Sequence, residues 1–298
     1  SGAHLQLLTA DASTVIPEWV SGEQPHVVRG LLEPDTEYIL KETAAPEGYL
    51  VTSAFAFRLD AQLNPTLTQT TVNGGVDGGV VYMVDNATTV TVSKRAVEGT
   101  SELPGAHFAI THLDAASALE VTDAEWTGTA TPKTINGLAV GVAYTLTEQS
   151  APAGYRLAAS VQFLILPDGG VVTRATGDTE YTPAANRTLT VLDDPTVVTF
   201  SKKGITGGEE LPGAHLTLTD HADSTKSWTW VSGETPHIIT GELEAGHTYT
   251  LTETTAPNGY AVSESVTFTV NADGTLQPGT VPANAGVDAA TGTVTMRD

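Results

Sequence analysis

Glu42-Thr-Ala-Ala-Pro-Glu-Gly-Tyr49 is the first of three copies of one pattern, and the others are Glu148-Gln-Ser-Ala-Pro-Ala-Gly-Tyr155 and Glu253-Thr-Thr-Ala-Pro-Asn-Gly-Tyr260. Each copy ends a segment with strand-like alternation, in which a Tyr and a Leu stand four and two residues before the Glu. Because successive side chains of a strand point to opposite faces, the Glu shares a face with that Tyr and Leu. The Pro and Gly that follow end the strand and turn the chain. The pattern therefore predicts three carboxylates on apolar faces, where a carboxylate is costly unless it has partners.

The pattern belongs to a longer repeat. Its second copy begins 106 residues after the first, and its third begins 105 residues after the second. Gly-Ala-His recurs near the start of each repeat, and Trp19, Trp126 and Trp230 hold equivalent places. A period this long, made of short strands, indicates tandem whole domains rather than a solenoid. We predict three domains, over residues 1–87, 88–195 and 196–298.

Composition favours an all-β protein. The 298 residues include 29 Gly and 16 Pro, 40% of them are hydrophobic, and we find no sustained helical periodicity. The net charge of -22 argues against binding to a nucleic-acid backbone or an anionic membrane. The absence of Cys excludes disulfides and thiolate metal sites. The connectors between repeats are too short to act as flexible tethers, which predicts a semi-rigid rod.

Several other signals favour structural roles. The eight His residues are scattered singly over the repeats, so we expect no metal site and no other cofactor. The Leu-Pro-Gly-Ala segments at 103–106 and 211–214 resemble a sortase signal superficially and are expected to be turns. Trp228 and Trp230 share a strand face, where either ordinary packing or a ligand-binding patch would explain them.

Two further charges in each of the second and third repeats fall on apolar strand faces. Lys94 and Lys202 stand in phase with apolar residues of the strands that open these repeats. Asp193 and Asp298 stand in phase with apolar residues of the strands that close them. Each of these repeats therefore places one Lys, one Glu and one Asp on apolar faces.

Such a set of charges allows two interpretations. It could be a buried ion-pair triad, or a group of strand-end charges that reach solvent. Alternatively, it could react: a desolvated Lys becomes a nucleophile, and an Asp carboxyl in the same place shifts towards its neutral, electrophilic form. A Glu between them would shuttle protons. The product would be an amide between the Lys and Asp side chains, with loss of one water.

The combination of motifs resembles the Cna B-type (SpaA-like) domains of Gram-positive surface proteins and pilins. A first strand ending in Ser-Lys, the Glu-x-x-Ala-Pro-x-Gly-Tyr pattern and a last strand ending in Asp carry this resemblance. It implies three tandem immunoglobulin-like β-sandwiches with spontaneous Lys–Asp isopeptide bonds and a catalytic Glu. The resemblance assigns Glu148 to the Lys94–Asp193 bond and Glu253 to the Lys202–Asp298 bond.

The first repeat departs from this pattern. It keeps Glu42 in the catalytic place and Asp85 as an unpaired acceptor, but it has no counterpart of the opening strand and its Lys. Lys41, its one lysine, falls on the opposite face. We expect a domain that lacks its N-terminal strand, forms no internal bond and accepts a separate Lys-bearing strand patterned on residues 198–202.

The resemblance implies a structural stalk segment of a cell-wall-attached, extracellular adhesin or pilin. Its expected partners are the neighbouring domains of the same surface protein. The alternative is a ligand-binding adhesin module that recognises a host protein or glycan. A turnover enzyme is not expected, because the crosslink would consume its own Lys and Asp. No targeting signal is evident, and we expect the chain to be a fragment of a longer protein.

Overall fold

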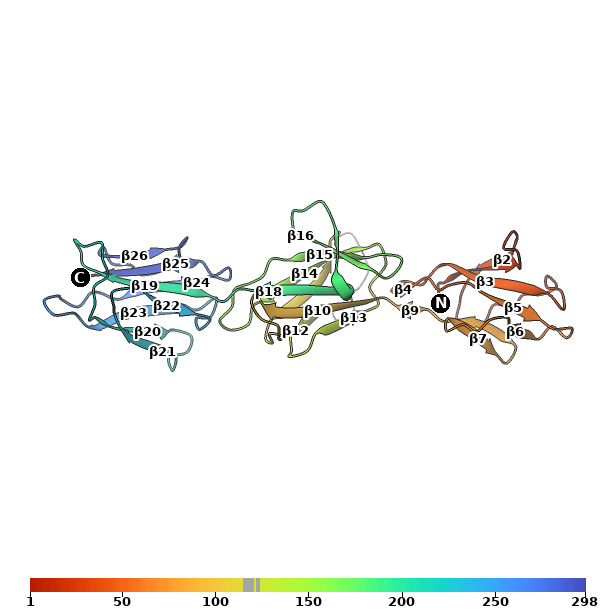
Figure 1. Cartoon of the computed structure of the whole chain (residues 1–298), viewed down its shortest axis with the longest axis horizontal. Helices are drawn as coiled ribbons and strands as arrows, with labels where there is room; N and C mark the ends of the chain where they lie inside the picture. Colours follow the sequence, from red (N-terminus) through yellow and green to blue (C-terminus); the bar gives the residue numbers. More distant parts are fainter. Residues whose placement is uncertain (115–120, 122–123) are drawn as a thin grey trace.

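The computed structural model describes residues 1–114, 121 and 124–298, and this part of the chain is built of short β-strands with one 3-10 turn. Three β-rich units follow one another along a single long axis (Figure 1). Unit 1 contains strands β1 to β8, unit 2 contains β10 to β18, and unit 3 contains β19 to β27. The N-terminus lies on the side of unit 1 that faces unit 2, and the C-terminus lies at the far end of unit 3 (Figure 1). No helix of the described residues is long and apolar enough to cross a membrane.

Unit 3 is a sandwich of two sheets. One sheet has the strand order β22-β19-β27-β26, and the other has the order β21-β20-β23-β24-β25. The opening strand β19 and the closing strand β27 are parallel neighbours. The strands are β19 (Val197–Lys203), β20 (His215–Asp220), β21 (Ser227–Val231), β22 (His237–Thr240), β23 (Thr248–Thr255), β24 (Val266–Val270), β25 (Leu276–Pro278), β26 (Ala285–Asp288) and β27 (Thr293–Arg297).

Unit 2 has the same plan. A sheet with the order β13-β10-β18 faces a sheet with the order β12-β11-β14-β15-β16-β17, and β10 and β18 are again parallel neighbours. Its elements are β10 (Thr89–Ala96), β11 (His107–His112), β12 (Glu125–Thr127), β13 (Lys133–Asn136), β14 (Ala143–Ser150), β15 (Val161–Ile165), β16 (Val171–Ala175), β17 (Thr182–Pro183), η1 (Ala185–Arg187) and β18 (Thr188–Asp193).

Unit 1 has one complete sheet, with the order β2-β1-β3-β5-β6, and a separate hairpin of β7 and β8. Its strands are β1 (His4–Thr9), β2 (Val15–Val20), β3 (Glu37–Ala44), β4 (Tyr49–Leu50), β5 (Phe55–Leu59), β6 (Pro65–Leu67), β7 (Gly74–Asp77) and β8 (Val80–Met83). The short strand β9 (Asn86–Ala87) pairs with β4 at the joint to unit 2. Among the described residues, unit 1 has no counterpart of β19, so the prediction of a missing N-terminal strand is confirmed.

The missing strand has a second effect. In unit 3, β22 and β27 both pair with β19. Residues 26–29, which correspond to β22, form no strand within the described chain. A strand without a ladder partner leaves its backbone groups unpaired, which explains why this segment is irregular.

The cores lie between the two sheets and follow the two-residue alternation of the strands. In β23, Tyr249, Leu251 and Glu253 are buried, while the threonines between them are half-buried. The same alternation occurs in β14 and β3. The prediction that each Glu shares an apolar face with a Tyr and a Leu is therefore confirmed, and Glu42, Glu148 and Glu253 are all buried.

Candidate functional site

The strand topology brings one Lys, one Asp and one Glu together in unit 2. Lys94 lies on β10, and the parallel register pairs it with Val191 of β18, two residues before Asp193. Lys94 and Asp193 therefore come from adjacent strands and point to the same side of their sheet. Glu148 comes from β14 in the facing sheet. The three charges meet inside the sandwich.

The contacts in unit 2 are direct. Lys94 Nζ contacts Asp193 Oδ1 and lies 2.8 Å from Glu148 Oε1. The side chains of Glu148 and Asp193 have no exposed surface, and that of Lys94 is 3% exposed. Lys94 Nζ also lies 5.8 Å from the centroid of the Phe108 ring. The interpretation that these charges reach solvent at a strand end is wrong, because all three side chains are buried.

Unit 3 repeats this arrangement. Lys202 Nζ contacts Asp298 Oδ1 and lies 3.1 Å from Glu253 Oε1. The side chains of Glu253 and Asp298 have no exposed surface, and that of Lys202 is 1% exposed. Unit 3 adds one polar group, because Lys202 Nζ donates to Ser263 Oγ at 3.1 Å. The Ser263 hydroxyl in turn contacts Asp298 Oδ1.

The turn that follows each Glu provides its anchor. Glu148 Oε2 accepts a hydrogen bond from the Ala158 N–H at 2.8 Å, and Glu253 Oε2 accepts one from the Ser263 N–H at 2.6 Å. In unit 1, Glu42 Oε2 accepts from the Thr52 N–H at 2.6 Å. The donor lies ten residues after the Glu in all three units. The Ala-Pro-x-Gly-Tyr turn thus returns the chain to hold one carboxylate oxygen and leaves the other facing the Lys.

Burial shifts the protonation of the acceptor carboxyl. Desolvation raises the pKa of Asp193 from 3.8 to about 7, and the neighbouring Glu148 adds to the rise while Lys94 opposes it. Asp193 Oδ2 and Asp298 Oδ2 are buried without a hydrogen-bond partner in the described part of the chain. The Oε1 atoms of Glu148 and Glu253 contact Lys without hydrogen-bond alignment. As ion triads, both clusters are therefore incompletely paired.

A further Glu, which the strand periodicity does not mark, positions each Lys. Glu102 accepts from the Lys94 N–H at 2.9 Å and from the Ser93 hydroxyl at 2.5 Å. Glu210 accepts from the Lys202 N–H at 2.9 Å and from the Ser201 hydroxyl at 2.5 Å. The signal was present in the sequence, because both repeats contain Glu-Leu-Pro-Gly-Ala after a Ser-Lys strand end.

Unit 1 holds the Glu and the Asp without the Lys. Glu42 is 3% exposed, and burial raises its pKa, with Asp85 adding to the rise. Glu42 Oε1 has no hydrogen-bond partner in the described residues. Lys41 is exposed on the opposite face, as predicted. Glu42 and Asp85 lie at a groove of about 750 Å³, which apolar side chains of both layers of unit 1 also line, among them Leu7, Trp19, Leu40, Phe57, Val81 and Met83.

The remaining candidates have structural surroundings. Trp228 and Trp230 are half-buried and pack against the core of unit 3, and Trp228 Nε1 donates to Glu242 at 2.5 Å. Trp230 also stacks on His237, as Trp19 does on His26. Within the described residues, no group of three His, Asp or Glu side chains has the geometry to hold a metal ion. The packing explanation for the two tryptophans therefore fits the structure better than an exposed ligand patch.

A comparison with solved structures finds similar chains. The pilus adhesin SpaC from Lactobacillus rhamnosus GG, in its open conformation, has 17% identity and a TM-score of 0.42, over 99% of this chain and 40% of that chain. The Bacillus anthracis TIE protein has 19% identity and a TM-score of 0.38, over 92% of this chain and 46% of that chain. The shaft pilin SpaA from Lactobacillus rhamnosus GG has 16% identity and a TM-score of 0.25, over 65% of this chain and 98% of that chain. The chain thus spans less than half of the length of SpaC and of the TIE protein.

A comparison with curated proteins finds no match to the sequence. The family model described as SpaA, prealbumin-like fold domain, matches three times, over residues 1–73, 88–180 and 196–280. These matches together cover most of the chain and fall one on each β-rich unit. The chain therefore belongs to the SpaA family of prealbumin-like fold domains, the Cna B-type (SpaA-like) domains that its motifs predicted.

Proposed function

We propose that units 2 and 3 each form a spontaneous Lys–Asp isopeptide bond, and that the chain is a structural stalk segment of a Gram-positive cell-surface adhesin or pilin. The observation that carries the proposal is the repeated contact of a buried Lys amine with a buried Asp carboxyl. The bonded pairs would be Lys94–Asp193 and Lys202–Asp298, with Glu148 and Glu253 as the catalytic groups. The domain limits that accompany this proposal are residues 1–87, 88–195 and 196–298.

The reaction balances without a cofactor. One proton first leaves the Lys ammonium, which gives Nζ a lone pair; Nζ then attacks Asp Cγ, the Nζ–Cγ bond forms, and the Cγ–Oδ2 bond breaks. In all, two protons leave the Lys ammonium, and both end on the departing oxygen, which leaves as one water. Glu148 and Glu253 would carry these protons, since their Oε1 atoms lie 2.8 Å and 3.1 Å from the Lys nitrogens. Each reaction would occur once, because it consumes its own Lys and Asp.

The surroundings favour the amide over the ion triad. Buried charges require complete pairing to offset their desolvation. The Oδ2 atoms of Asp193 and Asp298 lack a hydrogen-bond partner among the described residues. Condensation removes the charges of Lys and Asp from the core and expels one carboxyl oxygen from each cluster. The neutral product thus relieves the features that make each triad costly.

The position of the bonds suits a mechanical role. The opening and closing strands of units 2 and 3 are parallel neighbours. Lys94 and Asp193 lie 99 residues apart in sequence, and Lys202 and Asp298 lie 96 residues apart. Tension that enters through an opening strand would cross to the closing strand through the bond. The residues between the two attachment points would carry none of it.

Peptide mapping tests this proposal. The purified chain would be denatured and digested, and its fragments would be analysed by tandem mass spectrometry. We expect two branched peptides, one joining Lys94 to Asp193 and one joining Lys202 to Asp298, each lighter by one water than its two arms. Linear peptides with free Lys94 and Lys202 as the main products would overturn the proposal.

For unit 1 we propose a different partner, a separate Lys-bearing strand. Residues of β8 line the groove beside Glu42 and Asp85, and β8 lacks the parallel neighbour that its counterpart β27 has in β19. A strand patterned on Val198–Lys202 would pair with β8 and bring its Lys to Asp85. The chain would be incubated with this peptide and run on a denaturing gel. We expect a covalent adduct with the parent chain and none with Asp85→Ala or with a peptide whose Lys is replaced by Ala.

An adduct that persists in Asp85→Ala would place the reaction elsewhere. If the parent chain forms no adduct, the groove does not take this strand. Neither result bears on units 2 and 3, whose strands are complete.

A further inference from the structure

The joints between the units share one geometry. The joint between units 2 and 3 is centred on Thr196, and the joint between units 1 and 2 is centred on Thr88. Each Thr stands three residues after the Asp that closes the preceding unit. Thr88 is 0% exposed and Thr196 is 1% exposed, although both lie in short connectors. A buried polar residue in a connector requires a structural explanation, because connecting segments normally run over the surface.

Each Thr bonds to the units on both sides of it. The Thr196 N–H donates to the Gly154 carbonyl of unit 2 at 2.9 Å, and its hydroxyl donates to the Leu243 carbonyl of unit 3 at 2.6 Å. The Gly241 N–H of unit 3 donates to the Thr196 carbonyl at 2.8 Å.

The first joint repeats these bonds. The Thr88 N–H donates to the Gly48 carbonyl at 2.9 Å, its hydroxyl donates to the Leu138 carbonyl at 2.6 Å, and its carbonyl accepts from the Gly137 N–H at 3.1 Å. Two joints with different connector sequences therefore have the same three bonds at similar distances.

The Gly residues of the Ala-Pro-x-Gly-Tyr turns lie against the following unit. Gly154 has a φ of +81°, and a Cβ added to it would lie 2.1 Å from the Gly241 carbonyl oxygen. Gly48 has a φ of +80°, and its Cβ would lie 2.6 Å from the Gly137 carbonyl oxygen. Backbone meets backbone at both places, so the joint leaves no room for a side chain.

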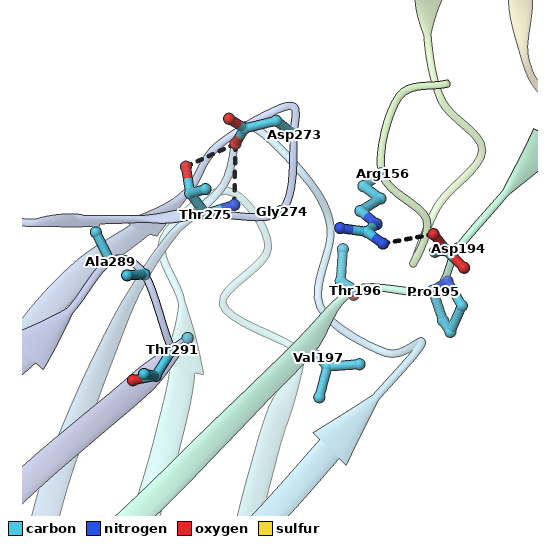
Figure 2. Close-up of a pocket in the computed structure, with 12 residues that line it drawn as sticks. Arg156, Asp194, Pro195, Thr196, Val197, Asp273, Gly274, Thr275, Ala289 and Thr291 are labelled. Atoms are coloured by element: carbon cyan, nitrogen blue, oxygen red, sulfur yellow. Dashed lines mark hydrogen bonds and ion pairs between the residues drawn. The ribbon is translucent and has the colours of Figure 1, made fainter. Parts of the chain in front are cut away.

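A second contact, away from the Thr, links the units at each joint. The Leu157 N–H of unit 2 donates to the Ala272 carbonyl, in the turn between β24 and β25, at 2.9 Å. Figure 2 shows Arg156 paired with Asp194 beside that turn, at a cleft of about 410 Å³. At the first joint, the Leu50 side chain lies against Gly169, in the turn between β15 and β16. Two separated contacts restrain both bending and rotation.

We propose that the Pro-x-Gly-Tyr end of each unit, besides returning the chain to hold the catalytic Glu, is a docking surface for the next unit. The partner it fits is a module of the same fold whose opening strand follows a Thr. In this chain the surface is occupied twice, at Gly48 and Gly154. The bonds that form the joint make it rigid, independently of whether the isopeptide bonds form.

Unit 3 supplies a matched control. Gly259 holds the same place in its turn and has a φ of +91°, but a Cβ added to it would meet no atom of the described chain within 4 Å. Gly154→Ala and Gly259→Ala therefore carry the same kind of backbone strain. Only Gly154→Ala also clashes with a neighbouring unit.

The experiment measures the distance distribution between two spin labels in the full chain. The chain has no Cys, so Glu180→Cys in unit 2 and Glu234→Cys in unit 3, both exposed, introduce unique label sites. Pulsed electron paramagnetic resonance would be recorded for this parent and for Gly154→Ala, Gly259→Ala and Thr196→Val. Thr196→Val removes the hydroxyl from the connector and leaves both turns unchanged. Circular dichroism verifies that each variant is folded.

We expect a narrow distribution for the parent and for Gly259→Ala. Gly154→Ala and Thr196→Val should broaden it about twofold or more, because the units gain hinge freedom. A Gly154→Ala distribution as narrow as that of the parent would overturn the proposal. Equal broadening by Gly259→Ala would also overturn it, because local strain would then be the cause. If Thr196→Val leaves the width unchanged, the Thr does not fix the joint.

Discussion

At the scale of single residues, each site combines three charges that a protein core rarely accepts together. A backbone N–H holds one carboxylate oxygen of Glu148 and of Glu253, and this bond orients the second oxygen towards the Lys. Glu102 and Glu210 fix the backbone of Lys94 and Lys202. The Lys, Asp and Glu side chains are therefore held in contact, which is the condition under which proximity would lower the barrier of the proposed reaction most.

Replacing the Glu tests its role as a proton carrier. Glu148→Gln keeps the shape of the side chain but cannot accept a proton, so Lys94 and Asp193 should stay unlinked. Intact-mass measurement should show the denatured variant one water below its own sequence mass, whereas the parent should be two waters below its own, and Glu253→Gln should likewise lose only one water. Glu42→Gln is the control, because unit 1 has no Lys to bond. A parent-like crosslinked mass for Glu148→Gln or Glu253→Gln would exclude that Glu as the carrier.

The buried Asp193 predicts a pH dependence of the uncrosslinked unit. Burial, the largest cause of its raised pKa, persists in Glu148→Gln, so its folded pKa remains above the unfolded value of 3.8. The folded state then binds a proton more tightly than the unfolded state, and the stability of the variant falls as the pH rises from about 4 through the folded pKa of Asp193. In a parent chain that carries the proposed bond, this carboxyl would no longer titrate. Melting temperatures across this range should fall more steeply for the variant, and parallel profiles would contradict the prediction.

At the scale of elements, the parallel pair of opening and closing strands is what each bond would secure. Closing a loop of about this length with a disulfide is estimated to stabilise a protein by ~4–5 kcal/mol through the entropy of the unfolded chain. We expect a comparable contribution from an amide, because it constrains the unfolded chain in the same way.

A pair of adjacent lysines separates this contribution from general charge effects. Lys202→Met keeps the volume of a buried side chain but removes the nucleophile, so unit 3 should lose the crosslink and melt at a lower temperature. Lys203→Met removes a partly exposed Lys that lies 3.8 Å from Glu210, and it should have little effect. Differential scanning calorimetry measures both variants. Equal melting temperatures for the two would mean that Lys202 forms no stabilising bond.

The elements also show how far the sequence alone could lead. The alternation of Tyr, Leu and Glu predicted the buried carboxylates, and the same two-residue test found the Lys and Asp that meet them, because register within a strand is a local property. The roles of Ser263 and of Thr196 were not foreseen. Both depend on contacts between segments that are distant in sequence, and no periodicity marks them. Thr88 and Thr196 both stand three residues after a closing Asp, but this spacing by itself does not predict that they join two units.

In unit 1, one departure from the repeat could be predicted from the sequence and another could not. The missing opening strand could be predicted from the repeat. In the second unit, residues 88–104 precede Gly-Ala-His and contain the opening strand, whereas in unit 1 the given sequence has one residue before Gly-Ala-His. The irregular structure of residues 26–29 could not be predicted, because their sequence resembles that of β22. Whether a segment forms a strand depends on its ladder partner as well as on its own residues.

At the scale of the whole molecule, the three units form a rod whose long axis runs through the joints (Figure 1). A rod that transmits tension needs firm joints and units that do not extend. The hydrogen bonds of Thr88 and Thr196 would make the joints firm, and the proposed isopeptide bonds would keep units 2 and 3 from extending.

Single-molecule stretching tests this combination. We expect unit 1 to unfold and lengthen, because it has no bond and an incomplete sheet. Units 2 and 3 should extend only by the few residues outside their Lys–Asp loops. Adding Lys202→Met should create one new unfolding event with the contour length of unit 3. Three full-length unfolding events in the parent chain would contradict the proposed path of force.

The mass of the intact, denatured parent chain tests the central claim most directly. Each isopeptide bond removes one water, so we predict a mass lower than the sequence mass by two waters, with unit 1 contributing none. A chain that weighs its full sequence mass would contradict the account, because the clusters at Lys94 and Lys202 would then be ion triads and not bonds.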